Sequence, residues 1–140
     1  MSPNRLFDAS SVVDVVLGTT STDVEIGVLF DECILDLTIY EAANAVWKIG
    51  VAHDRLTATD LDAAVELLTR LLDEFELESA TAASLVNTMT LARDNGLTFY
   101  DAAYLATAQR RNLTLVTEDG PLRDAADGQG VSTAQVRTLE

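Results

Sequence analysis

Short apolar segments that alternate with helical segments restrict the fold of this chain more than any other feature. Residues 5–8, 33–37 and 113–117 are short apolar runs, which are typical of buried strands. Between positions 61 and 75, apolar residues recur at spacings of three and four, which predicts a long amphipathic helix. Strands that alternate with helices predict an α/β sandwich with a mainly parallel sheet.

Capping residues predict where several of these elements begin and end. Ser10 or Ser11 is expected to cap a first helix that stops at Gly18, and Thr38 to cap a helix that runs to about Ile49. The other expected elements are a short helix up to Phe30, strands near residues 75–79 and 131–136, and helices over residues 85–95, from Thr98 to Arg111 and from Pro121 onwards.

The length and composition of the chain indicate one ordered domain. Its 140 residues suffice for a single core, and neither a repeat nor a Pro/Ser/Gly linker divides residues 1–140. No apolar run approaches the roughly 18 residues that cross a bilayer, and residues 1–5 lack the features of a signal peptide. A cytoplasmic protein without membrane contact is therefore expected. The single cysteine, Cys33, lies in an apolar stretch and is predicted to be a buried thiol without a chemical role.

The charge balance is strongly acidic. Nine basic residues against 23 acidic ones give a net charge of −14, and Lys48 is the one lysine. This composition is typical of halophilic proteins, while an acidic protein that binds a basic partner is the weaker interpretation because the acids are scattered. At low salt such a surface should repel RNA, but molar salt shortens the Debye length to about 3 Å and removes most of that repulsion.

Four acids are predicted to lie at one edge of the sheet. Asp8 ends the first strand, and Asp119 follows the strand over residues 113–117. Glu41 and Asp101 each come three residues after a threonine, in the expected first turn of a helix. Strand ends and the helix starts that follow them share the edge where α/β sheets bind ligands. The four carboxylates are therefore candidates for a common site.

A divalent cation would offset the repulsion between such carboxylates, which otherwise raise each other's pKa. Magnesium prefers oxygen ligands and retains several waters, so a few carboxylates with open positions suit it. A metal site of this kind can activate water to attack a phosphodiester. Zinc is disfavoured, because one histidine (His53) and one cysteine do not supply its usual ligands.

A purely structural interpretation of the same acids stays open at this point. The acids at positions 41 and 101, each with a threonine three residues before it, match the capping-box pattern. Asp8 would also serve as a helix cap, and Asp119 as part of an ordinary turn. In a sequence with 23 acids, several will occupy such positions by chance.

Four segments of the sequence resemble a known family. Residues 6–10, 37–44, 97–106 and 115–119 are similar in order and spacing to the PIN domain, and most similar to the VapC-type toxins of toxin–antitoxin pairs. The resemblance extends from residue 5 to about residue 136, and the segment 97–106 (LTFYDAAYLA) is its most specific part.

The resemblance implies a PIN-like three-layer sandwich, with a mainly parallel sheet flanked by helices. It also implies an endoribonuclease that uses Mg²⁺ (or Mn²⁺) to hydrolyse RNA phosphodiesters, is inhibited by a cognate antitoxin and forms a homodimer. The catalytic and metal-binding acids of the family correspond to Asp8, Glu41, Asp101 and Asp119, and its supporting residues to Asn44 and Thr117, with Ser10 placed to orient the first acid.

Two other hypotheses remain. A catalytically silent PIN-fold binding or scaffold module is the main alternative, although all four acids are present. Another magnesium-using α/β domain is disfavoured, because the only lysine lies early in the chain and no P-loop is present. Of the other residues, Asp36 ranks behind Glu41, Tyr104 is predicted to be core or interface, and Arg110 and Arg111 are predicted to complement a helix dipole.

Overall fold

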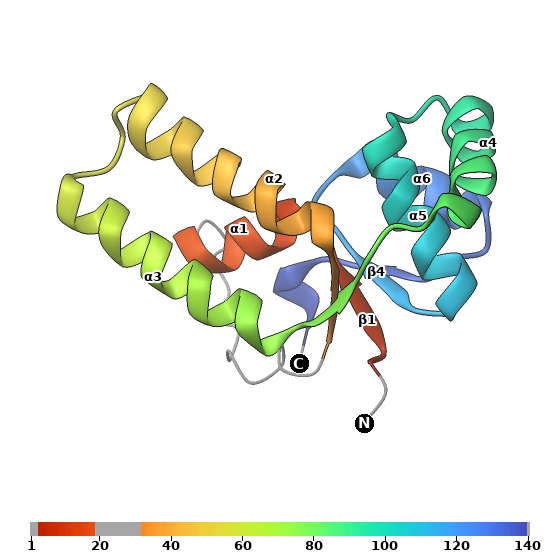
Figure 1. Ribbon diagram of the computed structural model, residues 1–140, viewed down its shortest axis with the longest axis horizontal. Coiled ribbons are helices and arrows are strands. Elements are labelled where there is room, and N and C mark those ends of the chain that lie inside the picture. Colours follow the sequence, from red (N-terminus) through yellow and green to blue (C-terminus); the bar gives the residue numbers. More distant parts are fainter. Residues whose placement is uncertain (1–2, 19–31, 140) are drawn as a thin grey trace.

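Five short parallel strands form the sheet in residues 3–18 and 32–139, the parts of the chain that the computed structural model describes (Figure 1). The strand order is β3-β2-β1-β4-β5, and each neighbouring pair is parallel. The predicted parallel α/β fold is confirmed. The helix expected up to Phe30 lies outside the described residues. The strands are β1 (Arg5–Phe7), β2 (Cys33–Leu35), β3 (Glu76–Glu78), β4 (Thr114–Val116) and β5 (Thr133–Ala134).

Helices cover both faces of this sheet, which makes three layers (Figure 1). One face carries α1 (Ala9–Leu17), α2 (Asp36–Trp47) and α3 (Ala58–Glu74). The other carries α4 (Leu85–Asn95), α5 (Phe99–Arg111) and α6 (Gly120–Gly128). In the described ranges, no helix has both the length and the apolar character that a bilayer span requires. Three short helical turns complete the described chain, namely η2 (Lys48–Ala52), η3 (Ala82–Ser84) and η4 (Val136–Thr138).

The alternation of side chains along each strand builds a core on either side of the sheet. Leu6 and Leu115 are fully buried against the layer of α4, α5 and α6. Their neighbours Phe7 and Val116 are fully buried on the opposite face, against α1, α2 and α3. Because successive side chains on a strand point to opposite faces, an uninterrupted apolar run is what a doubly covered strand requires.

Two helix starts differ from the prediction. Asp8, and not Ser10 or Ser11, caps α1, since its side chain accepts a hydrogen bond from the Ser11 backbone N–H. Helix α2 begins at Asp36 directly after β2, so Thr38 is not its cap but its third residue. No loop separates β2 from α2. The strand therefore ends two residues earlier than expected, and the helix turn begins before the threonine.

The other predicted boundaries agree closely with the structure. Gly18 and Gly96 end α1 and α4 in the left-handed conformation, with φ of 62° and 65°, as glycine C-caps commonly do. Thr98 caps α5, which ends at Arg111 as predicted. Helix α6 begins at Gly120 with a proline in its first turn, while the helical path after α2 continues as a π-turn to Ala52, beyond the expected end.

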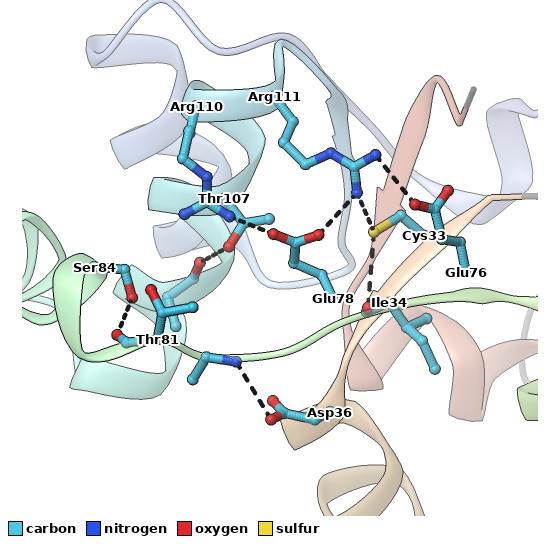
Figure 2. Close-up of polar contacts among 12 residues, drawn as sticks. Cys33, Ile34, Asp36, Glu76, Glu78, Thr81, Ser84, Thr107, Arg110 and Arg111 are labelled. Atoms are coloured by element: carbon cyan, nitrogen blue, oxygen red, sulfur yellow. Dashed lines mark hydrogen bonds and ion pairs between the residues drawn. The ribbon is translucent and has the colours of Figure 1, made fainter.

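Two arginines at the end of α5 form ion pairs with glutamates of the edge strand β3 (Figure 2). Arg110 and Arg111 place Nη atoms 2.6 and 3.0 Å from the two carboxylate oxygens of Glu78. Arg111 also reaches Glu76 at 3.4 Å and the sulfur of Cys33 at 3.5 Å. The two arginines lie at the helix end as predicted, and their guanidinium groups form ion pairs with glutamates of β3.

The thiol of Cys33 is fully buried, as predicted. Burial raises its pKa from 9.0 to about 11, against the opposing effect of the Arg111 guanidinium. At pH 8, Ellman's reagent should therefore react with the native thiol at least roughly 100-fold more slowly than with the urea-unfolded chain, because two pKa units remove that fraction of thiolate. A native rate equal to the unfolded rate would contradict this burial. The pKa of the Cys33 thiol is higher in the folded than in the unfolded chain. The stability that the neutral buried thiol contributes is therefore fully present below pH 9 and is lost as the pH rises through about 11.

Candidate functional site

The four predicted acids all lie beyond the carboxyl ends of the strands. Asp8 directly follows β1, and Asp119 caps the helix that follows β4. Asp101 is in the first turn of α5 as expected. Glu41 is not in the first turn of its helix, because α2 begins at Asp36 and places this glutamate in the second turn. The extra turn does not remove Glu41 from the same edge of the sheet.

Electrostatic interactions relate the four carboxylates to one another in pairs. The pKa of Glu41 is raised by burial first, and then by the charges of Asp101 and Asp8. The pKa of Asp101 is raised by burial, then by Asp119 and Asp8. Each of the four acids therefore interacts electrostatically with at least one of the others. This mutual repulsion is the cost that a bound cation would remove.

The donor set fits a hard divalent cation, because it consists of carboxylate oxygens from four separate elements. Within residues 3–18 and 32–139, no three His, Cys, Asp or Glu side chains already converge closely enough to hold a metal ion. Magnesium usually keeps several waters among its ligands. The chemistry of the site agrees with the metal interpretation, and the completed coordination stays a prediction.

Asp8 is the buried centre of a hydrogen-bond network. Its Oδ1 accepts from Ser10 Oγ at 2.7 Å and from the Ser11 N–H at 2.9 Å, while the Ser11 hydroxyl lies 3.0 Å away. Its Oδ2 accepts from Thr117 Oγ1 at 2.5 Å. Burial raises the pKa of Asp8, and these donors oppose that rise. The structural interpretation of Asp8 as a helix cap and its placement at the candidate site are therefore compatible.

Two of the three predicted supporting residues contact this network. Thr117 Oγ1 donates to Asp8 and accepts from the Asp119 N–H at 3.0 Å, so it links two of the acids. Ser10 Oγ donates to Asp8 and accepts from the Glu118 N–H at 3.2 Å. Asn44 lies exposed on α2, and its supporting role remains a prediction, as do the catalytic roles of the others.

Nearby acids outside the predicted set are engaged with the backbone. Glu118 accepts from the Val136 N–H at 2.8 Å and from Gln135 Nε2 at 3.3 Å, so it anchors the turn η4. Asp36 accepts from the Leu37 N–H at 2.8 Å and from the Ala80 N–H at 3.4 Å. Both carboxylates thus have structural partners that the four-acid site does not supply.

Tyr104 is a contact of the site that sequence reasoning missed. Its predicted burial is confirmed, with 1% of the residue exposed. Its hydroxyl, however, donates to Glu41 Oε1 at 2.8 Å and lies 2.8 Å from Thr38 Oγ1. The available signal was its position three residues after Asp101, which places both residues on one side of α5.

The fold and the site define a small parallel α/β domain with a carboxylate cluster beyond its strand ends. The PIN domain model matches residues 5–128, which is most of the chain. This chain belongs to the PIN domain family. The family resemblance drawn from the four sequence segments is thereby confirmed.

Two relatives of this chain come from Pyrobaculum aerophilum. Exonuclease VapC9 of Pyrobaculum aerophilum is 40% identical over 105 residues, which are 74% of each chain. Ribonuclease VapC3 of the same organism is 36% identical over 92 residues, 64% of this chain and 67% of the relative. Both names support the VapC-type assignment within the family.

Solved structures agree with the fold. PAE2754 from Pyrobaculum aerophilum has a TM-score of 0.80 and 34% identity, covering 99% of this chain and 95% of that one. FitAcB from Neisseria gonorrhoeae has a TM-score of 0.61 at 20% identity, with 96% and 99% covered, and this likeness concerns the fold alone.

Proposed function

We propose that this chain is a metal-dependent endoribonuclease that uses Mg²⁺ or Mn²⁺, and that it acts as the toxin of a toxin–antitoxin pair. The observation that carries the proposal is the position of Asp8, Glu41, Asp101 and Asp119 beyond the strand ends at one edge of the sheet. There, burial and then the charges of neighbouring acids of this set raise the pKa of Glu41 and of Asp101. Membership of the PIN family and two VapC relatives named as nucleases support it.

The residues of the site have two kinds of role: some would bind the metal ion, and others orient the carboxylates that bind it. The four acids would hold the metal, which when bound supplies a Lewis acid for the phosphoryl oxygens and lowers the pKa of water. Ser10 and Thr117 keep the Asp8 carboxylate in a fixed orientation through their hydrogen bonds. Thr117 also fixes the backbone at Asp119, so that the two acids keep a constant relation to each other.

The type of cleavage needs its own test, because one relative is named an exonuclease and the other a ribonuclease. Circular RNA, linear RNA and single-stranded DNA should be incubated with the protein and Mn²⁺, Mg²⁺ or EDTA. We expect metal-dependent cleavage of both linear and circular RNA. Cleavage of linear RNA alone would assign an exonuclease, and preference for DNA would change the substrate.

An inactive outcome has a defined meaning. A folded, partner-free preparation that cleaves none of these substrates at low or molar salt would favour the alternative function, a PIN-fold binding or scaffold module. Mn²⁺ binding without cleavage would keep the metal site and reject the substrate. Absence of both would reject the nuclease proposal altogether.

An antitoxin partner is part of the proposal, and an apolar groove between α2 and α3 supports it. Trp47, Val51 and Val65 are about half exposed there, at 52%, 51% and 47%. Asp62 and Glu66 also line the groove, so a partner segment with an apolar face and basic flanks would complement it. A pull-down of a candidate antitoxin with the wild type and with Trp47→Ala would test the contact, and we expect weaker capture by the variant.

The proposed homodimer has a separate surface. Val86 and Met89 of α4 are 77% and 58% exposed, and α4 and α3 cover opposite faces of the sheet (Figure 1). Exposed apolar side chains of this kind suit burial against a second copy. Sedimentation velocity of the wild type and of a Val86→Asp, Met89→Asp double variant would show whether a dimer forms through this helix.

The acidic surface should give RNA cleavage an unusual dependence on salt. Because the net charge is −14, RNA is repelled at low ionic strength. Raising KCl from about 0.1 M to about 1 M shortens the Debye length from about 10 Å to about 3 Å. We expect KM for RNA to fall at least about threefold over this range, opposite to the loss of affinity usual for nucleic-acid binding. A KM that rises with salt would reject both this effect and the halophilic interpretation of the composition.

A further inference from the structure

A buried chain of hydrogen bonds connects the end of β2 to the carboxylate of Glu41. The Tyr104 hydroxyl lies 2.8 Å from Thr38 Oγ1 and 2.8 Å from Glu41 Oε1. Thr38 Oγ1 in turn accepts from the backbone N–H of Leu35 at 3.1 Å. Thr38 is fully buried, and 1% of Tyr104 is exposed. The path joins three elements, β2, α2 and α5.

The number of available protons determines which group donates in each of these hydrogen bonds. An ionised carboxylate only accepts, so the single hydroxyl proton of Tyr104 is donated to Glu41. The Tyr104 oxygen must then accept from the hydroxyl of Thr38, which leaves the Thr38 oxygen to accept from Leu35 N–H. Each donor therefore has one acceptor, and no member can reverse without leaving a buried polar group unpaired.

The chain of hydrogen bonds also connects two of the four acids to each other. Tyr104 lies one turn after Asp101 on α5, and Glu41 lies on α2. A hydrogen bond from α5 to Glu41 therefore fixes the distance between the helices at the point where both carry a site acid. It engages Oε1 of Glu41, and among the described residues no hydrogen bond involves Oε2.

We propose that Tyr104 and Thr38 are positioning residues that orient the Glu41 carboxylate for metal binding. This inference rests on the proposed function, because it concerns the same site. A tyrosine that only filled the core would need a hydrogen-bond partner of any kind, whereas here the partner is a carboxylate of the cluster. Outer groups that orient metal ligands typically change metal affinity or activity by about 10- to 100-fold when they are removed.

The test compares Tyr104→Phe with Tyr100→Phe, which removes a hydroxyl from the same helix at a residue that is 57% exposed. Mn²⁺ affinity is measured without RNA by titration calorimetry, at a temperature where circular dichroism shows each variant folded. We expect Tyr104→Phe to weaken Mn²⁺ binding by about 10- to 100-fold, and to lower kcat with little change in KM for RNA. Tyr100→Phe should match the wild type.

Variants at Thr38 add a graded check. Thr38→Ser keeps the hydroxyl and should restore wild-type affinity. Thr38→Val removes the donor to Tyr104 and also the acceptor of the Leu35 N–H, so it should lower the midpoint of urea unfolding. It leaves the Tyr104 hydroxyl able to reach Glu41, so its effect on Mn²⁺ binding should be smaller than that of Tyr104→Phe. Equal Mn²⁺ affinities of the Thr38→Ser and Thr38→Val variants would overturn the positioning role of Thr38.

The possible failures are distinguishable. If Tyr104→Phe lowers the midpoint of urea unfolding but binds Mn²⁺ like the wild type, Tyr104 is only a core residue and the positioning role is wrong, while the proposed metal site stands. If the wild type itself binds no Mn²⁺, the proposed function and the positioning role are both overturned.

Discussion

Asp101→Asn should abolish RNA cleavage and leave the fold at least as stable as the wild type. The amide keeps the shape of the carboxylate but not its charge, so the proposed metal would lose one anionic ligand. A metal supplies several kcal/mol of transition-state stabilisation, and its loss corresponds to at least about a 1,000-fold fall in kcat. The cap of α5 is kept, because it is formed by Thr98 Oγ1 and the backbone N–H of residue 101.

The effect of Asp101→Asn on stability follows from the pKa of the acid. Burial, and then the charges of Asp119 and Asp8, raise the pKa of Asp101 in the fold. The charged form is therefore less favourable in the folded chain than in the unfolded chain. Above the ordinary pKa of aspartate, about 3.9, removing the charge should raise the free energy of unfolding of the metal-free protein.

Both effects can be measured on one preparation. Single-turnover cleavage in Mn²⁺ gives the activity, and urea unfolding in EDTA at pH 7 gives the stability. Asp124→Asn, an exposed acid of α6, controls for the loss of one negative charge and should leave cleavage unchanged. Full activity in Asp101→Asn would remove this acid from the proposed site, and a lower unfolding free energy would show that its carboxylate makes favourable contacts in the metal-free fold.

The sequence was sufficient to predict which acids share one edge of the sheet. That prediction depends on topology alone, because the ends of parallel strands and the starts of the following helices meet there. It tolerates errors in element boundaries. Glu41 was expected in the first turn of α2 and lies in the second, yet it still couples to Asp8 and Asp101.

Thr38 and Thr98 show why local patterns gave the wrong role for one of two similar motifs. Each threonine precedes an acid by three residues, and Thr98 does cap its helix. Thr38 does not, because β2 passes into α2 without a loop and the helix has already begun. Whether a strand and a helix are separated by a loop depends on how both pack on the sheet, which local spacing does not encode.

Long-range side-chain contacts were also beyond sequence reasoning. Tyr104 and Glu41 are 63 positions apart, and Thr117 and Asp8 are 109 positions apart. Capping and periodicity describe contacts within about four residues. The supporting role of Thr117 comes from the family resemblance, while Tyr104, to which the resemblance gives no role, is predicted from the sequence to be core or interface.

Asp8→Ala should destabilise the protein, in contrast to Asp101→Asn. Asp8 is 5% exposed, and its carboxylate caps α1 and accepts from Ser10, Ser11 and Thr117. Alanine removes the cap and leaves buried donors without their acceptor. Losing a cap costs about 0.5–2 kcal/mol, and an unsatisfied buried donor about 1–3 kcal/mol. Burial raises the pKa of Asp8, so removing its buried charge offsets part of this loss. We therefore expect the free energy of unfolding to fall by about 2–4 kcal/mol in total.

Asp8→Asn should lie between the alanine variant and the wild type. Its amide oxygen can replace one carboxylate oxygen, but its NH₂ group must then face either the Ser11 N–H or the Thr117 hydroxyl, both of which donate to Asp8 in the wild type. Facing Ser11, the amide leaves the backbone N–H without its acceptor. Facing Thr117, it can donate to Oγ1 only if the buried hydroxyl turns its own proton away from the amide. Urea unfolding in EDTA at pH 7 should rank the free energies of unfolding as wild type, asparagine, alanine. An alanine variant as stable as the wild type would show that burying the charge costs as much as the whole network contributes.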